Sequence, residues 1–105
     1  MSNTADRIEA EISQNEKPVI LEFHGHHCVP CITQDDLLTP ASGHPAFPAK
    51  VVSVNVDDTP EIAQRYAVKS VPSIVLIENG KTIAHFSGLV DAGSVLSAIQ
   101  ENQSK

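Results

Sequence analysis

Apolar residues recur along the chain with two spacings, and these spacings predict its first elements. Ile8 and Ile12 lie four positions apart within residues 4–15, as on one face of an amphipathic helix. Residues 19–24 form a nearly continuous apolar run, which is typical of a strand covered on both faces. Residues 50–56 are rich in valine and form the clearest strand signal of the chain. The first half therefore predicts at least one helix and two strands.

The second half of the chain carries the signals of two helices and a hairpin. Thr59-Pro60-Glu61 predicts a helix start, with a capping residue, a proline in the first turn and an acid facing the helix dipole. Residues 73–77 predict a strand, and Asn79-Gly80 predicts a tight turn into a return strand at 82–86. Asp91 predicts the cap of a last helix.

A further helix is expected to begin at Val29-Pro30, because proline is tolerated at the first helical positions. Pro40 and Gly43 are expected to break it. The early strands are expected to pair in parallel through right-handed crossovers, and the last two to form a hairpin. A chain of 105 residues is long enough for one domain, which we assign to residues 1–105.

Charge and composition narrow the classes of partner. The net charge of −6 argues against nucleic acid or an anionic membrane surface as the main partner. The hydrophobic content of 41% is typical of a globular domain. No apolar run approaches the ~20 residues of a membrane span, and the first residues show no secretion signal. We therefore expect a cytoplasmic protein.

The only two cysteines, Cys28 and Cys31, are spaced as C-x-x-C between a predicted strand and a predicted helix. In a reducing compartment such a pair is usually catalytic or metal-binding rather than structural. The positive end of the helix stabilises a thiolate on the first sulfur, which is the form that attacks disulfides. His24, His26 and His27 precede the pair, so a zinc or copper site is the alternative.

These residues and the downstream sequence resemble the thioredoxin family over residues 4–103. Cys28-Val29-Pro30-Cys31 is similar to the family's Trp-Cys-Gly-Pro-Cys active site, and Ser70-Val71-Pro72-Ser73 is similar to its cis-proline loop. Glu22 stands where the family has a buried aspartate. The resemblance implies that this sequence starts at the family's first helix, so we expect it to lack the family's usual N-terminal strand. The resemblance implies an α/β thioredoxin fold, with a mixed four-stranded sheet flanked by helices and residues 50–56 at one edge.

The chain departs from the family's pattern around the motif. His27 replaces the tryptophan before the first cysteine, Val29 replaces glycine, and His24 replaces a second tryptophan. Ser53 stands where the family often has a lysine near the buried acid, and Asp36 stands where the helix usually has a kinking proline. These departures leave the direction of exchange open.

The resemblance implies roles for the two cysteines and for the acid upstream of them. Cys28 is expected to attack a substrate disulfide, and Cys31 to resolve the mixed disulfide that forms. Glu22 is expected to be buried, which raises its pKa, and to accept a proton from Cys31 during resolution. His27 is expected to lower the pKa of Cys28.

Substrate contacts are expected on both sides of the cysteine pair. A cis bond before Pro72 is expected to expose backbone groups of Val71 to an extended substrate. Val29 is expected to lie exposed beside the first sulfur, and Val29 and Pro30 are expected to contact the substrate. Asp35 and Asp36 are expected to form a solvated acidic turn.

The sequence thus predicts a thiol–disulfide oxidoreductase that reduces protein disulfides. Its expected partners are disulfide-containing proteins and a thiol or flavoprotein reductase that recycles the pair, with no nucleic acid and no membrane. No cofactor is expected, because the redox couple is the Cys28–Cys31 pair itself. A disulfide oxidase or isomerase and a non-enzymatic protein- or metal-binding module are the alternatives. We expect a monomer, with weak dimerisation through the uncovered edge strand as a further hypothesis.

Overall fold

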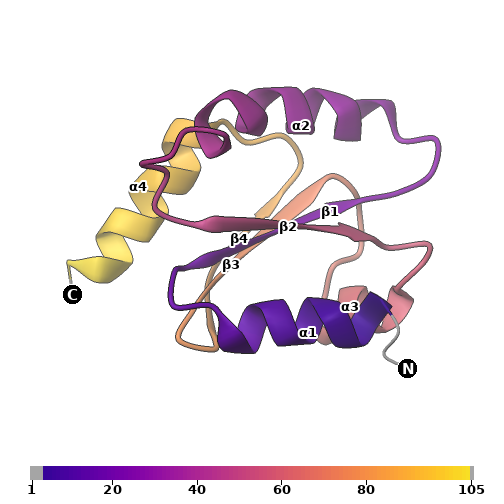
Figure 1. The fold of residues 1–105 in the computed structure, drawn as a ribbon. Helices are drawn as coiled ribbons and strands as arrows, with labels where there is room; N and C mark the ends of the chain where they lie inside the picture. Colours follow the sequence, from indigo (N-terminus) through magenta and orange to yellow (C-terminus); the bar gives the residue numbers. More distant parts are fainter. Residues whose placement is uncertain (1–3, 105) are drawn as a thin grey trace.

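The computed structural model describes residues 4–104, which form a central sheet between two layers of helices (Figure 1). The elements follow the order expected from the sequence. They are α1 (Thr4–Gln14), β1 (Val19–His24), α2 (Val29–Ser42), β2 (Lys50–Asn55), α3 (Pro60–Arg65), β3 (Ser73–Glu78), β4 (Lys81–Ser87) and α4 (Ala92–Gln103). No helix among the described residues is long and apolar enough to cross a membrane.

The four strands lie in the order β2-β1-β3-β4. β1 and β2 are parallel, as predicted, while β3 runs antiparallel to both β1 and β4. The predicted hairpin joins β3 to β4, and Asn79 and Gly80 at its turn both have positive φ, the conformation that favours asparagine and glycine. The prediction that β2 forms an edge of the sheet is confirmed among residues 4–104.

The central strand β1 is covered on both faces, which explains its continuous apolar run. Val19, Leu21 and Phe23 pack in the core beside α1 and α3. Ile20 packs in the other core, beside α2 and α4. Because side chains alternate along a strand, Glu22 leaves β1 on the same face as Ile20. The only acid of this strand therefore faces α2, the helix that carries the cysteines.

Helix α2 is longer than the sequence predicted. Pro40 was expected to end it, but the helix continues to Ser42 with Pro40 inside. Pro40 lies in the last turn, where its missing N–H costs only one helical hydrogen bond. The turn still closes, because the N–H of Gly43 donates to the carbonyl of Thr39 at 2.9 Å. The irregular segment before β2 therefore begins after Gly43.

Two predicted helix caps have different outcomes. Asp91 caps α4 as predicted, because its carboxylate accepts a hydrogen bond from the N–H of Ser94 at 2.7 Å. Thr59 stands at the N-cap position of α3, but its side chain makes no cap hydrogen bond. Its hydroxyl instead donates to the carbonyl of Asn55 at 2.9 Å. This bond ties the start of α3 to the end of β2.

Gln34 joins α2 to the segment before α4, and sequence reasoning did not find it. Its side chain is fully buried. The amide nitrogen donates to the carbonyl of Val90 at 2.9 Å, and the amide oxygen accepts from the N–H of Val90 at 2.9 Å. The amide therefore satisfies both backbone groups of Val90 and fixes α2 to the segment between β4 and α4.

We expect Gln34→Leu to lower the free energy of unfolding by about 2 kcal/mol, since both backbone groups of Val90 lose a partner. Urea unfolding of the oxidised protein measures this loss. Thr33→Ala, at the exposed neighbouring position of α2, serves as the control and should change stability by less than about 0.5 kcal/mol. Equal stability of Gln34→Leu and the parent would contradict this role of Gln34.

Candidate active site

The two cysteines form a disulfide at the junction of the β1–α2 loop and α2, with their Cα atoms 5.3 Å apart. Cys28 is the N-cap residue of α2, and Cys31 lies in its first turn. The N–H of Cys31 donates to the Sγ of Cys28 at 3.2 Å. An N–H at a helix N-terminus that points at a sulfur stabilises negative charge there. The loop therefore places Cys28 where a thiolate is favoured.

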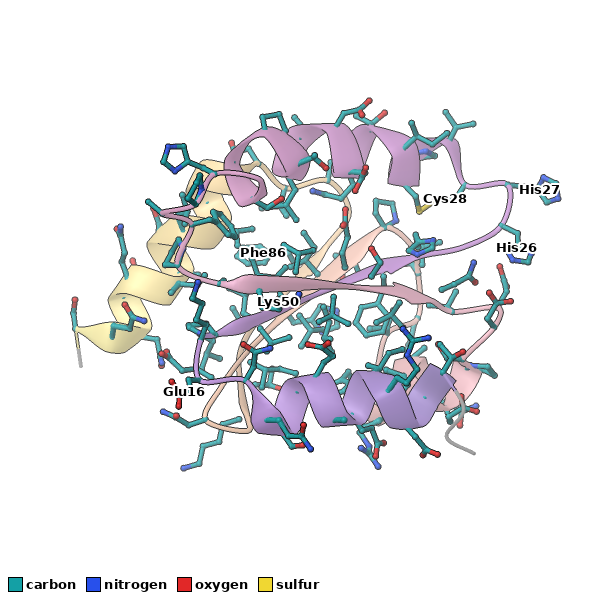
Figure 2. The ribbon with its side chains drawn as sticks, in the orientation of Figure 1. Glu16, His26, His27, Cys28, Lys50 and Phe86 are labelled. Atoms are coloured by element: carbon teal, nitrogen blue, oxygen red, sulfur yellow. A yellow bond between two sulfur atoms is a disulfide. The ribbon has the colours of Figure 1, made fainter. Side chains whose placement is uncertain are left out.

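The two sulfurs differ in their access to a partner. Cys28 is partly exposed, and Figure 2 shows its side chain at the start of α2. Cys31 is only 7% exposed. A large disulfide substrate therefore reaches Cys28 more readily than Cys31. This asymmetry favours the predicted roles of Cys28 as attacking and Cys31 as resolving thiol.

An apolar surface borders the cysteine pair. Val29 is 72% exposed, as predicted, and Pro30 is exposed beside it. Ile32, which sequence reasoning did not single out, is 64% exposed. Ile32 lies three positions after Val29 on α2, so the two side chains are neighbours on the helix surface.

The peptide bond between Val71 and Pro72 is cis, as predicted. The carbonyl of Pro72 accepts a hydrogen bond from the N–H of Gly88 at 2.9 Å, which ties this loop to the end of β4. Gly25 begins the loop that leads to Cys28. A methyl group at Gly25 would lie 3.6 Å from the side chain of Val71, so the proline loop and the cysteine loop lie side by side.

A cavity of about 350 Å³ lies beneath the cysteine pair, and Glu22 is on its wall with Cys28 and Cys31. Glu22 is 5% exposed, which confirms the predicted burial. Burial raises the pKa of Glu22 to about 7, and the nearby charge of Asp35 and a side-chain hydrogen bond with it add to the increase. Glu22 is thus poised to exchange a proton near neutral pH.

Asp35 is exposed, as predicted, but it also belongs to this site, which the sequence prediction did not include. Its side chain lines the same cavity as Glu22, and its charge adds to the burial effect that raises the pKa of Glu22. Asp35 lies four positions after Cys31 on α2, so both side chains occupy one face of the helix. This spacing was the signal in the sequence that could have found it.

The three histidines near the motif do not gather around the sulfurs. His24 is partly buried on the wall of the cavity. His26 is exposed, pairs with Asp58 at 3.6 Å and donates its backbone N–H to Asp57 at 2.7 Å. His27 is exposed with positive φ, and Figure 2 shows its ring pointing away from Cys28. The predicted lowering of the Cys28 pKa by His27 is therefore not supported by a direct contact between the two side chains.

The predicted alternative is a metal centre built from the cysteines and the neighbouring histidines. Within residues 4–104, no group of three or more histidine, cysteine, aspartate or glutamate side chains is arranged to hold a metal ion. The two cysteines are instead joined to each other in a disulfide.

An accessible sulfur joined to a buried one by a reversible bond, at a helix N-terminus, is the arrangement of a thiol–disulfide oxidoreductase. Comparison with known proteins leads to the same class. The family model of thioredoxin matches residues 1–101, and the chain therefore belongs to the thioredoxin family.

Individual relatives agree with this assignment. A thioredoxin of Rickettsia bellii is 29% identical over 102 residues, which cover 96% of this chain and 97% of that protein. Thioredoxin-1 of Drosophila yakuba is 31% identical over 88 residues, which cover 84% of this chain and 79% of that protein. The crystal structure of chloroplastic thioredoxin z is 19% identical and superimposes with a TM-score of 0.83, covering 98% of this chain and 93% of that one. The predicted thioredoxin fold is confirmed.

Proposed function

We propose that the chain reduces disulfides of protein substrates through the Cys28–Cys31 couple and is then re-reduced. The observation that carries the proposal is the asymmetric pair: a reachable Cys28 that accepts a backbone hydrogen bond at a helix N-terminus, beside a buried Cys31. Reduction is the direction that suits a protein kept in a reducing compartment, and we propose the cytoplasm as its location.

The reaction follows from the positions of the two sulfurs. The Cys28 thiolate attacks one sulfur of a substrate disulfide, the substrate S–S bond breaks, and its second sulfur leaves as a thiolate. Cys31 then loses its proton and attacks Cys28. The Cys28–Cys31 bond forms as the bond between Cys28 and the substrate breaks, so two electrons have passed from the protein to the substrate.

Glu22 is proposed as the base that accepts the proton of Cys31. Its carboxyl lines the same cavity as the buried sulfur. A general base works best when its pKa lies near the working pH, because a large fraction is then ionised and still binds a proton readily. The pKa of Glu22, at about 7, meets this condition. The burial of Glu22 on the wall of the cavity that Cys31 also lines suits the resolving step rather than the first attack.

Protein substrates are proposed to dock on the apolar border of the site. Val29 and Pro30 present apolar surface next to Cys28. Val71 and Pro72 lie on the loop beside Gly25 and offer backbone groups to an extended segment of substrate. An exposed apolar border of this kind suits a disulfide carried by a protein chain better than a small charged thiol.

Recycling completes the proposed cycle. The oxidised pair is proposed to be reduced by a thiol or by a flavoprotein reductase, which gives the protein a place in electron transport and in redox homeostasis. No bound cofactor is needed, because the cysteines carry both electrons. We propose a monomer as the working form, with weak pairing through the edge strand β2 as the alternative state.

A redox titration tests the direction of exchange. Metal-free protein is equilibrated in thiol–disulfide buffers, and its free thiols are counted by alkylation. We expect a two-electron couple at about −270 mV, the range of disulfide reductants. A couple well above about −200 mV would contradict reduction and identify an oxidase or isomerase. Such a high potential would mean that the Cys31 N–H directed at Cys28 stabilises the reduced thiolate strongly.

A further inference from the structure

Two carboxyl groups meet beneath the cysteine pair. Glu22 is buried on the central strand β1 and faces α2. Asp35 lies on α2, one helical turn after Cys31, and its side chain reaches the same cavity. Burial raises the pKa of Glu22, and the nearby charge of Asp35 and a hydrogen-bond interaction with it raise that pKa further. Because an ionised carboxylate only accepts hydrogen bonds, a hydrogen bond between the two groups forms only when one of them carries a proton.

The surroundings decide which carboxyl holds that proton. Glu22 is 5% exposed, whereas Asp35 is exposed and its charge is hydrated. Burial disfavours the charged form of Glu22, so the protonated Glu22 donates to the Asp35 carboxylate. Ionisation of Glu22 then brings two like charges together in one cavity, which adds to the effect of burial in raising the pKa of Glu22.

No lysine or arginine lies within the described lining of the cavity to offset that repulsion. β1 contributes Glu22 and His24, the N-cap of α2 contributes Cys28, α2 contributes Cys31 and Asp35, and β2 contributes the neutral Ser53. Ser53 pairs directly across from Glu22 in the sheet. Asp35 is therefore the ionisable group whose carboxyl both contacts Glu22 and reaches solvent.

We propose that Asp35 acts through Glu22: it accepts the hydrogen bond of the protonated Glu22 carboxyl and passes the proton of Glu22 to solvent while the cysteine pair exchanges. This inference rests on the proposed function of the pair. Asp35 is a positioning residue, since it acts on the sulfurs only by way of Glu22.

The proton and the electrons balance in this scheme. The thiol proton of Cys31 passes to the Glu22 carboxylate as Cys31 attacks Cys28. The new S–S bond forms, the bond from Cys28 to the substrate sulfur breaks, and the substrate leaves as a thiolate. Glu22 then hands its proton to Asp35, and Asp35 releases it to water. Water protonates the substrate thiolate, so no further reactant is needed.

The first test measures the titration of Glu22 by 13C NMR of its side-chain carboxyl in the oxidised protein. We expect a midpoint at pH about 7 in the parent. Asp35→Asn should shift the midpoint down by about one pH unit, because the like charge beside Glu22 is removed. The matched control is Asp36→Asn, which removes the same charge at an exposed neighbour outside the cavity lining. The control should leave the midpoint nearly unchanged.

The second test measures turnover of a disulfide-bonded model protein as a function of pH. The acid limb of the profile should move to lower pH in Asp35→Asn, and Asp35→Glu should restore the parent profile. A merely structural role would lower the rate without moving the limb. Equal shifts of the Glu22 midpoint in Asp35→Asn and Asp36→Asn would overturn the inference, as would an unmoved acid limb in Asp35→Asn.

The two tests separate this inference from the proposed function. The NMR titration uses the oxidised protein and requires no turnover, so it reports on the carboxyl pair alone. Loss of the expected Glu22 shift in a protein that reduces disulfides normally would overturn the role of Asp35 only. A parent protein that does not exchange disulfides would overturn the proposed function, whatever the titration shows.

Discussion

Replacing Cys28 with serine should abolish disulfide reduction, leaving only the background of uncatalysed thiol exchange. A serine hydroxyl cannot form the mixed disulfide, and the buried Cys31 is poorly placed to attack a large substrate in its stead. Turnover of a disulfide-bonded model protein with an excess of a small dithiol measures the effect. Cys28 is partly exposed, so the variant should fold like the reduced parent.

The matched variant is Cys31→Ser, which should fail at a different step. It retains the attacking sulfur at the helix N-terminus, so the first exchange with the substrate goes forward. It lacks the sulfur that resolves the intermediate, so a covalent adduct should accumulate at Cys28. Comparable turnover in Cys28→Ser and the parent would contradict the assignment of the attacking thiol.

Replacing Glu22 with glutamine should stabilise the protein at alkaline pH. The pKa of Glu22 rises from 4.5 to about 7 on folding, so the folded state holds the proton more tightly than the unfolded state does. Below pH about 4.5 both states are protonated and nothing is lost. As the pH rises from about 4.5 to 7, the unfolded state releases its proton first, and stability falls. The loss is complete above the folded pKa and amounts to about 3 kcal/mol.

Urea unfolding of the oxidised protein at pH 4.5 and pH 8 measures this linkage. Glu22→Gln removes the ionisation while keeping the shape of the side chain, and its amide can donate to Asp35. The variant should match the parent at pH 4.5 and exceed its free energy of unfolding by up to about 3 kcal/mol at pH 8. Glu101→Gln, at an exposed position of α4, is the control and should show no such dependence. A Glu22→Gln protein that is less stable than the parent at pH 8 would argue against a buried, destabilised carboxylate.

The central strand and the cysteine motif could be predicted because their signals are local. The apolar run of residues 19–24 is continuous because both faces of β1 are covered, and its bounds are those of the strand. The Asn79-Gly80 turn was predictable since both residues accept the positive φ that the hairpin requires. The position of Cys28 at the start of α2 was predictable, because it follows a predicted strand and precedes a proline in the first turn of the helix.

The features that escaped prediction depend on contacts between distant segments. Gln34 is an ordinary polar residue in the sequence, and its role arises only when Val90 is brought against it, 56 positions away. Asp35 was predicted only as part of a solvated turn. Its spacing of four positions from Cys31 on α2 could have indicated that it also lines the cavity that contains Glu22. Pro40 was expected to break α2, but its place in the last turn made the lost hydrogen bond tolerable.

The most direct test of the account is mass spectrometry of the Cys31→Ser variant after reaction with a disulfide-bonded protein. The account predicts one covalent adduct per molecule, joined to Cys28 by a disulfide that a small thiol releases. The Cys28→Ser variant, treated in the same way, should carry little or none. An unmodified Cys31→Ser protein under conditions where the substrate disulfide is accessible would contradict the assignment of Cys28 as the thiol that attacks substrate.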